Sequence, residues 1–516
     1  MANPLLVSPK KLLQTTLLRS LSTRPLTSAA PSSSSLTLEP KPTTTTTSTF
    51  QDSTINIGIV SHTHTIHEYQ NSKKSAHRDL LVSPTINLDD TESLYSSVST
   101  TKLLRSALNL HVAAAEPMVD LGMWVMKYSK LMDTSLLRGV IRHTFFEHFC
   151  AGENLAEACR KVSQVSESGL RGMLDYAVEH AGDNESCDRN LDGFLRTVEA
   201  AKSLPRSSVS SVVVKVTAIC PIDLLKRVSD LLRWEYKNES FQLPWKLTTL
   251  PIFSDSSPFY HTPMKPDPLT PEEEQDLNLG HQRLQKLSES CLEANIPMVV
   301  DAEDTSIQPA IDYFTYSAAI RYNKDDNPIV YGTIQSYLKD AKERLHLASN
   351  AAEKMGVPMG LKLVRGAYMS SERKLAASLG VESPIHNTID QTHACFNDCA
   401  TFMLEKAANG SGAVVLATHN FESGIKAAEK AQELGMGKEK QKLEFAQLYG
   451  MADALSFGLR NAGFQVSKYM PFGPVEKVMP YLLRRAEESR GLLSASTLDR
   501  QLLRKELQRR LKAAII

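Results

Sequence analysis

Two adjacent arginines, Arg484 and Arg485, are the residues of this chain best suited to bind a small acid. In a helix, Tyr481 and Glu488 lie three or four residues away and share their face. Neighbouring guanidiniums repel each other unless an anion lies between them, and a guanidinium binds a carboxylate through two parallel hydrogen bonds. Glu488 can compensate one arginine and leave the other for an acidic substrate. The alternative is a solvated basic face near the end of the chain.

The segment that positions this face changes from an extended run, GFQVSKYMPFG, into a helix that has Pro474 and Glu476 at its start. Between Ser168 and this run, short apolar stretches alternate with amphipathic helical patterns, which is typical of βα units. The predicted strands lie at 170–178, 211–219, 297–303, 328–335, 359–367, 413–419, 443–450 and 464–470. Eight apolar strands with helices between them favour a closed (βα)8 barrel of the TIM type over an open doubly wound sheet.

Polar side chains recur at the carboxyl ends of these predicted strands, where barrel enzymes place their active sites. They are Lys215, Thr217, Asp301, Glu303, Gln335, Lys362, Arg365, Tyr368, Thr418, His419, Asn420, Gln447, Tyr449 and Tyr469. Each has an ordinary structural explanation when taken alone: Asp301 as a cap, His419 as a core histidine, Lys215 as a lysine with a buried stem. Their repetition from strand to strand indicates a polar pocket instead.

The absence of several motifs narrows the chemistry of this pocket. The sequence has no HExxH, DxD or GxSxG pattern, so it predicts neither a metal site nor acyl transfer through a serine. It also lacks GxGxxG, so a nucleotide cofactor would not bind through a Rossmann loop. Donors such as His419, Asn420, Gln335 and Lys362, all facing one pocket, could instead hydrogen-bond a flavin.

Composition excludes further classes of protein. Lysine plus arginine and aspartate plus glutamate both number 58, so charge gives no reason to expect a nucleic-acid partner. Seven cysteines without a CxxC pair argue against a disulfide framework or a zinc site and fit a reducing compartment. No uncharged apolar run approaches the ~18 residues that span a bilayer.

Composition also divides the chain. The first 50 residues carry Lys10, Lys11, Arg19 and Arg24 but no acid before Glu39, and the Ser/Thr-rich remainder is typical of a transit peptide. The predicted parts are the transit peptide at 1–50, a polar arm at 51–100, a helical lead-in at 101–165, the barrel at 166–500 and an amphipathic tail at 501–516. An irregular stretch at 234–277 is predicted to be an insertion on the barrel rim and a candidate lid.

In order along the chain, the motifs KVTAICP, VVDAEDTSIQPAID, GTIQSYLKDA, LKLVRGAYMSSER, ATHN, QLYGMAD and YMPFGPVEKVMPYLLRRAEES resemble those of proline dehydrogenases. The similarity covers most of 165–495 and is closest to the monofunctional mitochondrial form, and the leader suggests a plant protein. It implies a (βα)8 flavoenzyme that oxidises L-proline to Δ1-pyrroline-5-carboxylate with FAD, and whose last helix lies over the mouth of the barrel.

The resemblance also implies a role for individual positions. Arg484 and Arg485 would hold the proline carboxylate, with Lys215 nearby, and Asp301 would help to position the substrate. Four residues would line the substrate's apolar ring: Tyr368, Leu448, Tyr469 and Tyr481. Eight positions would contact the flavin or support its site: Gln335, Lys362, Val364, Gly366, Thr418, His419, Asn420 and Glu488.

Physical reasoning supports these roles. The substrate amine must be neutral when hydride leaves the neighbouring carbon for the flavin, so anchoring and alignment matter more than a strong acid or base. Asp301 is therefore assigned to positioning and not to proton abstraction. Bifunctional bacterial relatives carry arginine at Lys362, and a lysine offers a point charge in place of a planar fork, which leaves the flavin's reactivity towards oxygen open.

The resemblance further implies electron transfer to ubiquinone, peripheral contact with the inner mitochondrial membrane and a position on its matrix side. It implies no aldehyde dehydrogenase domain and no DNA-binding segment. Three alternatives remain at this point: a hydroxyproline dehydrogenase, a Schiff-base aldolase that uses Lys215 or Lys362, and a non-catalytic binding barrel. The bulk of Tyr469 argues against the first, because it leaves little room for a ring hydroxyl.

Overall fold

A computed structural model describes residues 86–113, 139, 142, 146–436, 442–491 and 493–515. Side chains at 112, 113, 480 and 485–496 lie outside this description. The predicted transit peptide at 1–50 and most of the polar arm at 51–100 also lie outside it. Contacts along the chain separate 1–80 from the unit formed by 81–516, and the fold below is that of the second unit.

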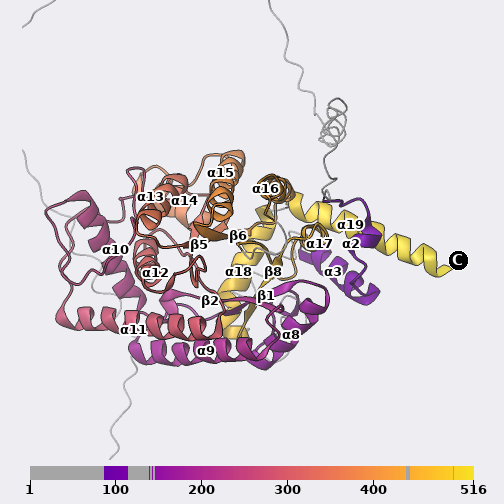
Figure 1. Ribbon diagram of the computed structural model, residues 1–516, viewed down its shortest axis with the longest axis horizontal. Coiled ribbons are helices and arrows are strands. Elements are labelled where there is room, and N and C mark those ends of the chain that lie inside the picture. Colours follow the sequence, from indigo (N-terminus) through magenta and orange to yellow (C-terminus); the bar gives the residue numbers. More distant parts are fainter. Residues whose placement is uncertain are drawn as a thin grey trace, which may run out of the picture. The chain divides into compact units, whose positions relative to one another are not determined.

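Eight parallel strands form a closed barrel in the order β1 to β8, with β1 paired to β8 (Figure 1). The strands are β1 (Arg171–Tyr176), β2 (Val209–Val214), β3 (Met298–Val300), β4 (Val330–Gln335), β5 (Met359–Val364), β6 (Gly412–Ala417), β7 (Leu443–Leu448) and β8 (Val466–Phe472). The predicted (βα)8 barrel is therefore confirmed. Six strands end earlier than predicted: β1, β2, β3, β5, β6 and β7. Because β2 stops at Val214 and β3 at Val300, Lys215 and Asp301 lie just beyond their strands.

Helices connect the strands on the outside of the barrel. They are α9 (Asn184–Ser203), α10 (Ile222–Lys237), α11 (Pro271–Ala294), α12 (Gln308–Tyr322), α13 (Ala341–Lys354), α14 (Met369–Leu379), α15 (Ile389–Ala408), α16 (Phe421–Glu433) and α17 (Asp453–Asn461). After β8 the chain continues into α18 (Val475–Gly491), which packs on the carboxyl ends of the strands. Local sequence determines where several of these helices begin. At α11, for example, Thr270 and Glu273 form a capping box, and Pro271 lies in the first turn.

Successive side chains of each strand point alternately into the barrel and towards the helices, so the core has an inner and an outer part. One set of side chains fills the barrel interior: Met173, Val213, Val299, Tyr331, Ala413, Val415 and Ala446. The neighbouring positions, such as Leu174, Val212 and Leu416, face the helices and join the larger core. Because both faces of each strand are covered, the strands are apolar almost throughout.

The predicted insertion at 234–277 is shorter in the structure, because α10 continues to Lys237 and α11 already begins at Pro271. The irregular segment, 238–270, is held by hydrogen bonds to the helices on that side. Tyr313 accepts from the backbone N–H of Leu247 at 2.9 Å, and Ser257 donates to Asp340 at 2.7 Å. Leu250 and Ile252 are buried against the main core.

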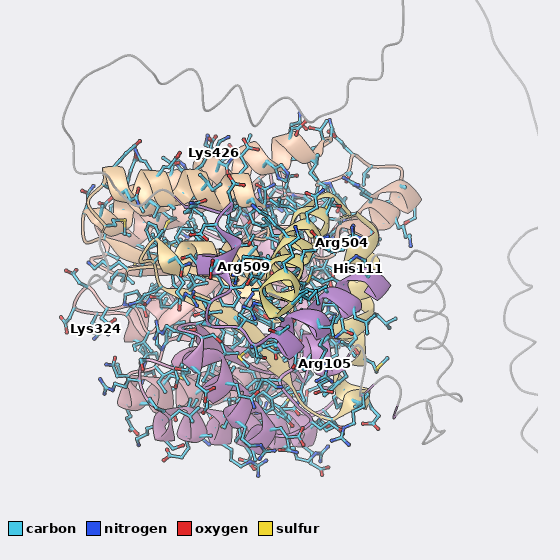
Figure 2. The ribbon with its side chains drawn as sticks, turned by 90° about the vertical axis from the view of Figure 1, so that its right-hand side faces the viewer. Arg105, His111, Lys324, Lys426, Arg504 and Arg509 are labelled. Atoms are coloured by element: carbon cyan, nitrogen blue, oxygen red, sulfur yellow. The ribbon has the colours of Figure 1, made fainter. Side chains whose placement is uncertain are left out.

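Helices from both ends of the described chain pack together beside the barrel (Figure 1). They are α2 (Thr91–Leu94), α3 (Thr100–Ala113) and α19 (Leu493–Ile515). An ion pair between Arg105 and Glu147 joins α3 to α7 (Glu147–Phe149), whereas α8 (Leu155–Glu167) packs on β1 and β8. The predicted tail at 501–516 is the second part of α19, which packs against α3 through buried residues such as Leu502 and Leu503. Figure 2 shows Arg504 of α19 next to His111 of α3. Among the described helices, none combines the length and apolar character needed to cross a membrane.

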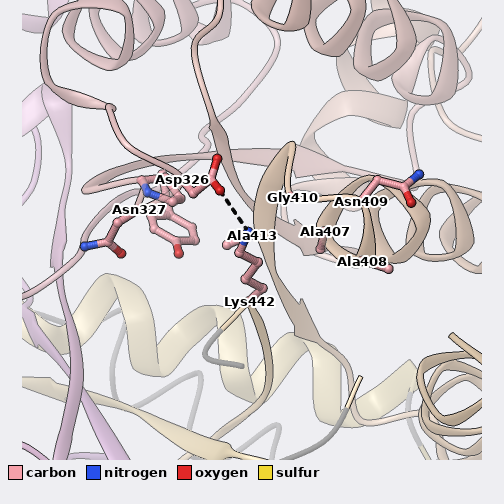
Figure 3. Close-up of a pocket in the computed structure, with 10 residues that line it drawn as sticks. Asp326, Asn327, Ala407, Ala408, Asn409, Gly410, Ala413 and Lys442 are labelled. Atoms are coloured by element: carbon pink, nitrogen blue, oxygen red, sulfur yellow. Dashed lines mark ion pairs between the residues drawn. The ribbon is translucent and has the colours of Figure 1, made fainter. Parts of the chain in front are cut away.

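A hollow of about 480 Å³ lies at the amino ends of β4, β6 and β7 (Figure 3). Lys442, before β7, and Asp326, before β4, form a 3.9 Å ion pair at its wall. This hollow lies at the end of the barrel opposite to the residues predicted to form the site.

Candidate active site

Five polar groups meet at the carboxyl ends of β1, β2, β3, β5 and β8. Lys215 Nζ lies 3.1 Å from Asp175 Oδ1 and 3.3 Å from Asp301 Oδ2. Lys362 forms an ion pair with the other oxygen of Asp301. The Tyr469 hydroxyl lies 2.7 Å from Asp301 Oδ2 and 2.8 Å from Asp175 Oδ2. These residues are here called the Asp–Lys cluster: Asp175, Lys215, Asp301, Lys362 and Tyr469.

The two aspartates of this cluster have opposite pKa shifts. Burial alone would raise the pKa of Asp301, but Lys362 and Lys215 outweigh it and hold that pKa well below its usual value. Asp175 is also buried, and Lys215 and the hydrogen bond with Tyr469 do not outweigh the effects of burial and of Asp301, so its pKa is raised. The cluster therefore contains one firmly ionised carboxylate and one that retains its proton more readily.

Helix α18 lies across the carboxyl ends of β1, β7 and β8, where its buried face packs on Ala177, Leu448 and Tyr469. This contact stacks Tyr481 on Tyr469, with ring centroids 6.4 Å apart and an interplanar angle of 21°. One turn further along α18, the Arg484 guanidinium lies 5.6 Å from the ring centroid of Tyr368. A cation and three aromatic rings thus lie together beside the Asp–Lys cluster.

The loop after β5 places Tyr368 against Arg484 through an unusual backbone conformation. Gly366 has φ +103°, and Tyr368 has φ +57°, a left-handed conformation that is uncommon for a residue with a side chain. Such strain is retained where surrounding contacts hold it, commonly at functional sites. Here it lets the chain turn from β5 into α14 with the Tyr368 ring directed at Arg484.

A second group of polar residues follows β5 and β6. Arg365 donates to the Thr418 hydroxyl at 2.7 Å and lies 3.0 Å from His393 Nδ1. His419 Nε2 accepts the backbone N–H of Leu448 at 3.1 Å. The Asn420 side chain caps α16 by accepting from the N–H of Ser423 at 2.8 Å.

This second group has the features of a site for a flavin. Gln335 donates to the Tyr337 hydroxyl, but its buried Oε1 has no hydrogen-bond partner among the described residues. No heavy atom lies within 4 Å of the position that a Cβ of Gly366 would occupy. Arg365 forms no ion pair within the described parts of the chain, and burial lowers its pKa to about 10. These three features suit a flavin cofactor. The amide oxygen and the open space beside the backbone suit a planar polar ring, and the cation suits its phosphates.

Comparison with known proteins agrees with this geometry. A sequence model of the family described as proline dehydrogenase matches residues 158–497. The chain belongs to the proline dehydrogenase family. The resemblance found in its motifs is thereby confirmed, and so is the predicted class, an oxidoreductase that acts on proline.

Proline dehydrogenases from plants are similar to this chain over most of its length. The mitochondrial proline dehydrogenases 1 and 2 of Arabidopsis thaliana are 61% and 60% identical to it, and each match covers 83% of this chain and 87% or 91% of the relative. Human hydroxyproline dehydrogenase is 31% identical over 80% of this chain and 91% of its own. The names of the plant relatives support a mitochondrial location.

Among solved structures, proline utilization A from Bdellovibrio bacteriovorus superposes with a TM-score of 0.53 at 18% identity. The match covers 82% of this chain and 40% of that protein, and it supports the barrel fold alone. Proline dehydrogenases are flavoenzymes, so the cofactor class expected at the second group of residues is a flavin.

Membership of the proline dehydrogenase family removes two of the alternatives, the aldolase and the non-catalytic barrel. The Asp–Lys cluster gives a physical reason for excluding the aldolase. A Schiff-base lysine must be able to lose its proton. Burial would lower the pKa of Lys215, but Asp175 and Asp301 outweigh it and raise that pKa well above its usual value. Lys362 is bound to Asp301.

Most of the predicted site residues lie at this end of the barrel. Lys215, Asp301, Lys362 and Tyr469 are in direct contact, Leu448 and Tyr481 pack beside them, and Arg484 and Tyr368 are in contact nearby. Gln335, Val364, Gly366, Thr418, His419 and Asn420 lie at or just after the carboxyl ends of β4, β5 and β6. The side chains of Arg485 and Glu488 lie outside the described residues.

Two residues in contact with this site are absent from the predicted set, Asp175 and Glu179. Asp175 is the acid in the buried strand β1, and Glu179 follows four residues later. The sequence contains the signal that could have identified them, an acidic residue near the carboxyl end of an apolar strand. Such a carboxylate has no packing role, as for the polar residues of the other strands. The predicted set begins at the second strand, so it contains neither residue.

Proposed function

We propose that the chain oxidises L-proline to Δ1-pyrroline-5-carboxylate with FAD as its cofactor. The observation that carries this proposal is the position of Arg484 over the ring of Tyr368, next to the stacked pair Tyr469 and Tyr481. A guanidinium bordered by aromatic rings suits a small amino acid with a carboxylate and an apolar ring.

In this proposal, Arg484 and Arg485 bind the substrate carboxylate and Lys215 adds positive charge nearby. Tyr368, Leu448, Tyr469 and Tyr481 enclose the pyrrolidine ring and exclude water. Asp301, held ionised by Lys362 and Lys215, fixes Tyr469 through a 2.7 Å hydrogen bond. These residues align the substrate, and alignment of this kind contributes a large part of the rate enhancement in such sites.

The FAD would be held by the second group of residues. Gln335 offers an amide oxygen that has no hydrogen-bond partner among the described residues. Lys362 offers a cation, and the backbone from Val364 to Gly366 offers an open surface. Thr418, His419 and Asn420 would border the cofactor on the β6 side, and Glu488 is assigned to its support through the resemblance alone. The bound flavin supplies the chemistry of the reaction by accepting a hydride from the substrate carbon next to nitrogen.

For the electrons we propose ubiquinone as the acceptor, which implies peripheral contact with the inner mitochondrial membrane on its matrix side. The mitochondrial plant relatives support the compartment. The acceptor and the side of the membrane come from the resemblance to the family.

Hydroxyproline is the second candidate substrate, because the human relative at 31% identity is named for it. Tyr469 argues against it here. Its ring is stacked on Tyr481 and its hydroxyl is held by the Asp–Lys cluster, so it cannot move aside for a ring hydroxyl without breaking these contacts.

Anaerobic titration of the purified chain, lacking its first 50 or so residues, tests the proposal directly. We expect a yellow protein whose visible absorbance bleaches with L-proline and hardly changes with hydroxyproline. A yellow protein that stays oxidised with L-proline would contradict the substrate. A protein that stays colourless after FAD is added would contradict the cofactor.

A further inference from the structure

The hydrogen-bond pattern around Tyr469 requires one more hydrogen than the phenol possesses. Its oxygen lies 2.8 Å from Asp175 Oδ2 and 2.7 Å from Asp301 Oδ2, both within the usual range for O–H···O bonds. A phenol has one hydrogen to donate. If both carboxylates were ionised, one of these short contacts would bring two oxygens together without a hydrogen between them.

Lys215 does not remove this difficulty. Its Nζ lies 3.1 Å from Asp175 Oδ1 and 3.3 Å from the phenol oxygen, so it donates to other acceptor positions. Its donation uses a lone pair of Tyr469 and places no hydrogen between Tyr469 and either carboxylate. One of the two aspartates must therefore donate to Tyr469.

The surroundings identify the donor as Asp175. Asp301 lies between two ammonium groups, those of Lys362 and Lys215. The groups that face Asp175 are Lys215 from the loop after β2, Asp301 from the loop after β3, Tyr469 from β8 and the thiol of Cys150. Only one of these is a cation, and the Asp175 side chain is 1% exposed against 13% for Asp301.

We propose that Asp175 is a positioning residue that is protonated in the resting enzyme, and that it donates this proton to the Tyr469 oxygen. Tyr469 then donates its own hydrogen to Asp301, and Lys215 donates to the second oxygen of Asp175. The Asp–Lys cluster has two ammoniums and one carboxylate in this state, so it carries a net charge of +1. The role of this charge rests on the proposed function: an incoming substrate carboxylate neutralises it.

Infrared difference spectroscopy on the resting holoenzyme tests the proton without turnover. The carbonyl stretch of a protonated carboxyl group should be lost in Asp175→Asn and retained in the matched variant Asp301→Asn. Tyr469→Phe should shift this band, because Asp175 then loses its acceptor. If the difference spectrum between wild type and Asp175→Asn contains no carboxyl carbonyl band, the proposal is wrong. It is also wrong if the band is present but Tyr469→Phe leaves it unchanged.

Kinetics of flavin reduction give a second readout. Asp175→Ala should lower kcat/KM for proline by about tenfold or more, the usual effect of leaving buried polar groups without a partner. Asp175→Asn should recover most of this loss, because an amide replaces the protonated acid in shape and in donor capacity. If asparagine loses as much as alanine, an ionised Asp175 is required and the proposal is wrong.

The pH dependence adds a readout that a merely structural role would not change. As pH rises through the pKa of Asp175, the cluster loses its net positive charge, so the KM for proline should rise in the wild type. Asp175→Asn should flatten this rise. If the infrared band is present but proline does not reduce the flavin, the proposed function fails while the protonation of Asp175 stands.

Discussion

Arg484 donates a hydrogen bond to each carboxylate oxygen of Glu179, at 3.2 and 3.3 Å. Glu179 is 8% exposed, and Arg484 outweighs the effect of burial, so the pKa of Glu179 is lowered. The guanidinium that the sequence assigns to the substrate is thus already bound to a carboxylate from the loop after β1. A substrate carboxylate must replace Glu179 or share Arg484 with it.

This pairing predicts that Arg484 acts mainly through substrate binding. Arg484→Gln should raise the KM for proline by about ten- to a hundredfold, since a hydrogen bond to a charged group contributes about 1.5–3 kcal/mol. The maximal rate of flavin reduction should fall less. Anaerobic stopped-flow reduction over a range of proline concentrations separates the two effects, with the exposed Arg196→Gln as a control.

Glu179→Gln should have the opposite effect on binding. A neutral amide competes less for the guanidinium, so the KM for proline should fall or stay the same. A rise in KM comparable to that of Arg484→Gln would show that Glu179 orders the arginine instead of competing with the substrate.

Substrate choice should depend on the bulk of Tyr469. Tyr469→Ser removes the ring stacked on Tyr481 and should raise the ratio of kcat/KM for hydroxyproline to that for proline. Tyr469→Phe keeps the bulk and should leave that ratio unchanged, although it lowers both activities by removing the hydrogen bond to Asp301. An equal change of the ratio in both variants would mean that the hydroxyl, and not the ring, determines the specificity.

Removing the positive charge of Lys362 should change the acid side of the pH profile. In the wild type, Lys362 and Lys215 keep the pKa of Asp301 far below its usual value, so Asp301 stays ionised at mildly acidic pH. In Lys362→Met that pKa rises, and protonation of Asp301 should reduce the rate of flavin reduction at a higher pH than in the wild type. Lys362→Arg keeps the positive charge, so its rate should fall at the same acidic pH as in the wild type. If the rate of Lys362→Met also falls at the wild-type pH, Asp301 is not the titrating group.

The docking of α19 should weaken as pH rises. Asp499 accepts the N–H of Ala454 at the start of α17 at 3.1 Å, and burial together with Asp453 raises its pKa to about 7. A raised carboxyl pKa means that the stabilisation is complete below the unfolded-state pKa and is lost as pH rises through about 7. Between pH 6 and 8 the wild type should lose about 1 kcal/mol.

Thermal unfolding at a series of pH values measures this loss. Asp499→Asn keeps an oxygen that can accept from Ala454 and does not titrate, so its melting temperature should depend less on pH in this range. The exposed Asp223→Asn is a suitable control. An equal pH dependence in wild type and Asp499→Asn would contradict the raised pKa.

The sequence alone determined the barrel and the types of residue in the site. Buried strands must be apolar, so the eight runs were visible as such, and the polar residues that interrupt their carboxyl ends, such as Lys215 and Lys362, had no role in packing. The helical spacing of Tyr481, Arg484 and Arg485 was likewise set by local geometry.

Only the tertiary structure decided which of these groups are partners. Asp175 and Tyr469 are 294 residues apart and meet because β1 and β8 close the barrel. Glu488 was expected to balance one of the two arginines, without any indication of which, and the structure pairs Arg484 with Glu179, 305 residues away. Periodicity reports which face a residue occupies, whereas the pairing of charges depends on how the strands close and how α18 crosses their ends.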